Sequence, residues 1–163
     1  MLVSSVSFKG IPINYLKIDN TVSRSAQPNA DDFLWLSEHG VTDIINFRTM
    51  KVEKLDFSEP ELVKRLGMNY HNIPSYTREP NENNILKFLE IINEVKSRAG
   101  KVHIHCMAGA DRTGMYAYIY KIINKIDTPL KNENEWIKMG HHRQLYPDLI
   151  PKTKELLKKM KIL

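Results

Sequence analysis

The chain has 163 residues, of which 42% are hydrophobic and 26% are charged, so it has the composition of a globular protein and enough length for one sizeable core. It has no apolar run near the roughly 18 residues of a membrane span and no signal-peptide pattern. We therefore expect a single domain over residues 1–163, located in the cytoplasm and without membrane insertion. A longer exported precursor is also compatible with the sequence. The single cysteine excludes an internal disulfide, and the net charge of +5 favours anionic ligands without the motifs of a nucleic-acid-binding protein.

Strands are predicted to alternate with helices along the chain. In chain order we expect a hairpin at 15–24, a helix at 30–39, a strand at 41–47, one or two short helices within 50–66, a strand at 68–73, a helix at 81–98, a strand at 101–104, and helices at 115–123, 129–139 and 152–160. Asn29 and Thr128 are expected helix caps, and Pro60 is expected to interrupt the helical stretch around it. This alternation predicts an α/β fold with a mostly parallel central sheet and helices on both faces.

The stretch that carries the chemistry is the ten-residue segment 105–114, with the sequence HCMAGADRTG. It joins a predicted strand to a predicted helix, whose first N–H groups lack partners and carry partial positive charge. The small residues 108–110 let the backbone close around an oxyanion, and Arg112 adds a planar fork for two of its oxygens. The same positive groups favour the thiolate of Cys106, so we expect a nucleophile at the floor of a phosphate-binding loop.

This segment resembles the HC-x5-R-T loop of the cysteine-based phosphatases, the protein tyrosine and dual-specificity enzymes. The segment RSAQP at 24–28 is similar to one in compact, mostly microbial members, and the resemblance covers roughly residues 15–123. It implies a three-layer phosphatase fold, one phosphatase domain, and hydrolysis through a cysteinyl-phosphate on Cys106, with no metal and no cofactor. The expected phosphate-binding residues are Met107, Ala108, Gly109, Ala110, Asp111 and Arg112.

Four further residues are expected to support this loop. His105 is predicted to hold the loop through hydrogen bonds, and Thr113 to donate its hydroxyl to the sulfur or to the leaving group. In the resemblance Arg24 lies close to the catalytic loop, where it either ties loops together or touches substrate. Arg48 follows a strand at the carboxyl edge of the sheet and either binds substrate or forms a structural ion pair.

The proton donor for the leaving group is the open question of the sequence. Related phosphatases usually carry an Asp on the loop that corresponds to 74–80, but here the only carboxyl group in that loop is Glu79. Glu79 is therefore one candidate acid, unless it only complements the start of a helix. Asp111 is the other candidate, unless it holds loop amides or orients Arg112. The histidines at 141–142 follow a helix end and either line the cleft or are exposed, and we expect exposure.

The expected substrates are phosphomonoesters: a phosphorylated protein or peptide carrying phosphotyrosine, with phosphoserine or phosphothreonine also possible. An inositol phosphate or phosphoinositide is the alternative, although Met107 and Ala110 occupy places where relatives that read polyphosphates carry lysines. A phosphate-binding module without catalysis and a rhodanese-like sulfurtransferase are further alternatives. We expect a monomer.

Overall fold

The structure is a computed structural model that describes residues 10–49 and 55–163, so part of the helical stretch predicted within 50–66 lies outside the described residues. The strands are β1 (Leu16–Lys17), β2 (Val22–Ser25), β3 (Asp43–Asn46), β4 (Asn69–Asn72) and β5 (Val102–His105). The helices are α1 (Ala30–Glu38), α2 (Glu59–Arg65), α3 (Glu82–Ser97), α4 (Arg112–Ile123), α5 (Pro129–Lys138) and α6 (Leu149–Lys159).

The five strands form one sheet in the order β1-β2-β5-β3-β4. The hairpin strand β1 runs antiparallel to β2, and all other neighbours are parallel, which confirms the mostly parallel sheet. His105 at the end of β5 pairs with Ser25 on one side and with Asn46 on the other. The carboxyl ends of three strands therefore meet where the chain leaves β5 for the loop 106–111.

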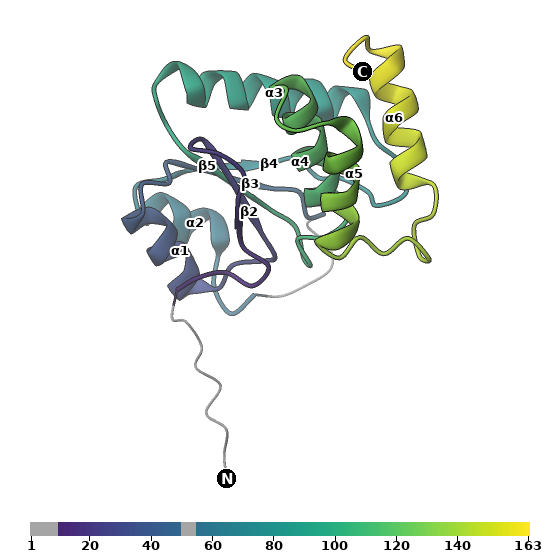
Figure 1. Cartoon of the computed structure of the whole chain (residues 1–163). Coiled ribbons are helices and arrows are strands. Elements are labelled where there is room, and N and C mark those ends of the chain that lie inside the picture. Colours follow the sequence, from purple (N-terminus) through teal and green to yellow (C-terminus); the bar gives the residue numbers. More distant parts are fainter. Residues whose placement is uncertain (1–9, 50–54) are drawn as a thin grey trace.

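Helices cover both faces of the sheet, as predicted (Figure 1). Helices α1 and α2 pack on one face around a small core that includes Phe33 and Ile44. Helices α3 to α6 lie on the other face, over a larger core that includes Ile45 and Tyr116. Within the described ranges no helix has both the length and the apolar character needed to cross a bilayer.

Three helix boundaries differ from the predicted ones. Pro60 does not interrupt a helix but lies in the first turn of α2, where its missing N–H needs no partner. Helix α6 begins at Leu149 rather than at 152, with Pro151 in its first turn for the same reason. Helix α4 begins at Arg112 rather than at 115, so the predicted loop passes directly into the helix.

The loop after β5 passes so close to β2 that only glycine fits at one position. Gly109 has a φ of +68°, and a Cβ there would lie 2.4 Å from the amide nitrogen of Ala26 and 2.4 Å from the carbonyl carbon of Ser25. Both the backbone conformation and the space therefore exclude a side chain.

A buried histidine joins β2 to β5 beneath this loop. The ring nitrogens of His103 lie 2.7 Å from Ser23 Oγ and 2.6 Å from Ser25 Oγ. The Ser25 hydroxyl donates to the carbonyl oxygen of Ala26, so it accepts from Nε2–H, and a neutral ring satisfies both serines. Burial, together with the neighbouring His105, lowers the pKa of His103 well below its usual value of 6.5.

We expect Gly109→Ala to lower the free energy of unfolding by about 2–5 kcal/mol, the sum of overpacking and of left-handed backbone strain. Gly67→Ala is the matched control, because Gly67 has a φ of +81° but nothing within 4 Å of the added Cβ. That control loses only about 1–2 kcal/mol for the backbone strain. Urea unfolding of both variants measures the difference, and equal losses would contradict the close approach.

The neutral His103 makes stability depend on pH. Below about pH 6.5 the unfolded chain binds a proton at this residue and the folded chain does not. The free energy of unfolding therefore falls by about 1.4 kcal/mol for each pH unit below that point through this residue alone. Urea unfolding between pH 5 and 7.5 should give a shallower slope for His103→Asn than for the parent chain, and identical slopes would refute the assignment.

Candidate active site

The loop 106–111 leaves the end of β5 and enters the N-terminus of α4, with the Cys106 side chain only 2% exposed at its start. A cavity of about 310 Å³ opens above it. Its lining residues are Arg48, Thr49, Thr77, Cys106, Met107, Ala108, Asp111, Arg112, His142, Leu145 and Tyr146. A larger cavity of about 590 Å³ lies between α5 and α6 and contains neither Cys106 nor Arg112, so the chemistry belongs to the smaller one.

The carbonyl groups of the loop point away from the cavity because donors outside it hold them. Gln27 N donates to the oxygen of Met107 over 2.9 Å, and Arg24 Nη2 to that of Gly109 over 2.7 Å. Asn14 Nδ2 lies 3.4 Å from the oxygens of Ala108 and Gly109. In a trans peptide the following N–H points the opposite way, so the amides of 108–110 turn towards the cavity. In the described part of the chain none of these three amides donates a hydrogen bond.

Two buried polar atoms beside the sulfur also lack partners within the described residues: Arg112 Nε and Thr113 Oγ1. Buried donors are rarely left unpaired, so the Arg112 fork is available for an anion that enters the cavity. Of the two acceptors expected for the Thr113 hydroxyl, the sulfur of Cys106 accepts no hydrogen bond from it in this structure, and donation to the leaving group stays a prediction.

Arg24 acts on the loop from behind. Its side chain is 1% exposed and does not line the cavity, so it ties the loop to β2 rather than facing substrate. Burial lowers the pKa of Arg24 from its usual value, while the charges of Glu135 and of the Cys106 thiolate oppose this shift. The guanidinium lies 4.0 Å from Glu135. A buried cation therefore stands close enough to Cys106 for the two groups to interact electrostatically.

A row of hydrogen bonds connects the cavity wall to the end of β5. Arg48 Nη1 donates to Gln27 Oε1 over 2.6 Å, and Gln27 Nε2 donates to Glu59 over 2.7 Å. The other Glu59 oxygen lies 2.8 Å from Nε2 of the fully buried His105. Nδ1 of His105 lies 3.1 Å from the carbonyl oxygen of Cys106, so this row braces the residue that carries the nucleophile. Glu59 is not among the residues expected from the sequence, because no local motif surrounds it.

Asp111 is bound by both histidines that follow α5. His141 Nδ1 lies 2.7 Å from Asp111 Oδ1, which also accepts the backbone N–H of His142 over 2.8 Å. His142 Nδ1 lies 2.7 Å from Oδ2. Burial raises the pKa of Asp111, but these hydrogen bonds lower it more, so the carboxylate is ionised at neutral pH. The expectation that both histidines are exposed is wrong for His141, which is buried.

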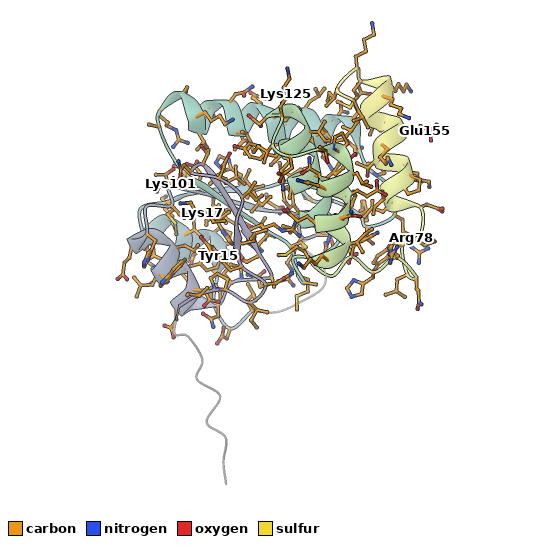
Figure 2. All side chains as sticks on the ribbon, viewed as in Figure 1. Tyr15, Lys17, Arg78, Lys101, Lys125 and Glu155 are labelled. Carbon is orange, nitrogen blue, oxygen red and sulfur yellow. The ribbon has the colours of Figure 1, made fainter. Side chains whose placement is uncertain are left out.

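Glu79 does not reach the cavity. Its side chain is 76% exposed and lies 3.2 Å from Lys152 on α6. Ser75 fixes the start of this loop through a 2.7 Å hydrogen bond to the hydroxyl of Tyr116, and Thr77 is the loop residue that lines the cavity. Arg78, labelled in Figure 2, lies beside the segment between α5 and α6, 5.8 Å from the centre of the Tyr146 ring. The structure therefore leaves Glu79 without access to a bound phosphate.

Relatives with this fold are known in bacteria. The dual specificity protein phosphatase TpbA of Pseudomonas aeruginosa is 24% identical over 111 residues, which are 68% of this chain and 47% of TpbA. The chain thus spans about half the length of the curated relatives it matches. A candidate phosphatase from Shewanella putrefaciens has a TM-score of 0.76 at 22% identity and 91% coverage of each chain. The crystal structure of TpbA gives a TM-score of 0.72 at 21% identity, over 88% of this chain and 84% of that chain.

The matched region of the family described as "Polymorphic toxin system, DSP-PTPase phosphatase" runs over residues 20–124. It includes both the segment at 24–28 and the loop 106–112, and it covers more than half of the chain. The chain belongs to this family of dual-specificity-type, cysteine-based phosphatases.

Proposed function

We propose that the chain hydrolyses phosphomonoesters through a cysteinyl-phosphate intermediate. The observation that carries this proposal is the geometry of the loop: its carbonyls at 107–109 are held from outside, and its amides at 108–110 have no partner within the described residues. Cys106 and Arg112, whose Nε is unpaired there, line the same cavity. Such a set of donors matches the oxygens of a phosphate and the charge that develops on them in the transition state. The helix N-terminus adds partial positive charge at the same point.

The reaction follows from these positions in two steps. The Cys106 thiolate attacks phosphorus in line, the S–P bond forms, and the P–O bond to the substrate breaks with its electron pair on the leaving oxygen. Loop amides and Arg112 hold the other three oxygens. Water then attacks the phosphorus of the cysteinyl-phosphate, and the S–P bond breaks to return the thiolate and inorganic phosphate.

Phosphotyrosine in a protein or peptide is the substrate that the cavity favours. Three apolar or aromatic side chains, Met107, Leu145 and Tyr146, line the cavity above the phosphate loop and offer contact area to an aryl ring. No lysine is among the described lining residues, whereas an inositol polyphosphate carries several further phosphates that need cations. Two solved structures with this fold are named for different substrates. One is TpbA in complex with phosphotyrosine, and the other is the PP-IP phosphatase Siw14 of S. cerevisiae. The fold itself therefore does not decide the substrate.

We expect Cys106→Ser to reduce phosphate release to the background rate while keeping the affinity for a phosphotyrosine peptide, because the amides and Arg112 remain. The matched variant Arg112→Lys keeps the sulfur but loses the planar fork, so its binding of the same peptide should weaken. Titration calorimetry and phosphate release measure the two properties separately. Residual turnover in a clean Cys106→Ser preparation would disprove the nucleophile.

A panel of substrates tests the proposed preference for phosphotyrosine. Phosphate release should be fastest from a phosphotyrosine peptide and slower from a phosphoserine peptide and from inositol hexakisphosphate, because the apolar wall contacts only the aryl ring. Preferential turnover of inositol hexakisphosphate would overturn the substrate assignment and keep the reaction. Thiosulfate turnover without phosphate release would replace the phosphatase with a sulfurtransferase.

A further inference from the structure

The leaving oxygen needs a proton, and Asp111, the carboxyl group among the described residues that line the cavity, is poorly placed to supply it. Both oxygens of Asp111 accept hydrogen bonds from the 141–142 segment, three in total, at 2.7 to 2.8 Å. The carboxylate is buried and ionised, and protonating it would break these bonds. Glu79 lies outside the cavity. Among the described residues that line the cavity, the candidate donor is a group that Asp111 itself holds.

His142 has the contacts of such a group. It lines the cavity that contains Cys106, and its side chain remains 48% exposed while its partner His141 is buried. Its Nδ1 donates to Asp111, and within the described residues Nε2 has no hydrogen-bond partner. A carboxylate on Nδ1 fixes the ring orientation, so that Nε2 faces a substrate in the cavity and can exchange a proton with it.

We propose that His142 is the general acid of the first step and the general base of the second, and that Asp111 is its positioning residue. In the first step the Nε2–H proton moves to the leaving oxygen as the P–O bond breaks, and the imidazole becomes neutral. In the second step Nε2 takes a proton from the attacking water as the S–P bond breaks. The imidazolium is thereby restored, and no further reactant is needed.

This inference rests on the proposed phosphatase function and is tested by how the rate depends on the leaving group. p-Nitrophenyl phosphate has a leaving group that needs little protonation, whereas an alkyl phosphate needs a full proton. For His142→Asn we expect kcat/KM to fall by about 10²- to 10⁴-fold on the alkyl phosphate and by less than about tenfold on the aryl one. The Asn side chain can still donate to Asp111, so a loss confined to the poor leaving group reports the missing proton.

Two further variants separate proton transfer from positioning. Asp111→Asn should show the same leaving-group selectivity as His142→Asn, because the ring of His142 loses the carboxylate that fixes its orientation. His39→Asn is the matched surface control: His39 closes α1 and bonds to the carbonyl oxygen of Trp35, and it does not line the cavity. This control should keep the leaving-group dependence of the parent chain.

The outcomes distinguish this inference from the function on which it rests. Equal losses of His142→Asn on aryl and alkyl phosphates, or no loss on either, would overturn the acid role and leave the phosphatase intact. If the parent chain released no phosphate from p-nitrophenyl phosphate, the proposed function itself would fail.

Discussion

The outward orientation of three loop carbonyls is the constraint on which the site depends. A backbone can present several N–H groups to one anion only if the carbonyls between them find partners elsewhere. Here Arg24 in β2 and Gln27 in the segment after β2 supply those partners together with Asn14. The cost falls on Arg24, a buried cation whose pKa is lowered by desolvation. The thiolate and Glu135 offset part of that cost.

The sequence alone identifies those parts of the site that come from one continuous segment of the chain. The strand, loop and helix around Cys106 follow from residues 101–123 alone, because spacing within one segment fixes which backbone groups converge. The hydrogen bonds that orient this loop, in contrast, join residues that are far apart in the sequence. His105 meets Glu59 across 46 positions and Asp111 meets His141 across 30, and no periodicity in the sequence encodes either contact. The first contact depends on how α2 packs against β4 of the sheet, and the second on how α5 packs against α4.

For the loop at 74–80, the sequence predicts the position of the loop but not the orientation of its side chains. Its place after β4 correctly predicts that it approaches the phosphate loop, because parallel strands end at one edge of the sheet. The loop is anchored by the hydrogen bond between Ser75 and Tyr116, 41 residues away, and Thr77 is its residue that lines the cavity. Glu79 is the only carboxyl group of the loop, but it points to Lys152 on the surface. Residue type alone therefore does not tell which side chain of this loop faces the cavity.

With His142 as proton donor, the acid of this site is assembled before substrate arrives. Asp111 belongs to the phosphate loop itself, and its bonds to the 141–142 segment fix that segment relative to the sulfur. An acid on a separate loop has to be brought into position in each turnover, which costs conformational entropy. An imidazole held by a carboxylate from the same loop as the nucleophile avoids this cost, because the phosphate, the sulfur and the proton donor share one rigid frame. With His142 held by Asp111 as the proton donor, the loop at 74–80 needs no aspartate to protonate the leaving oxygen.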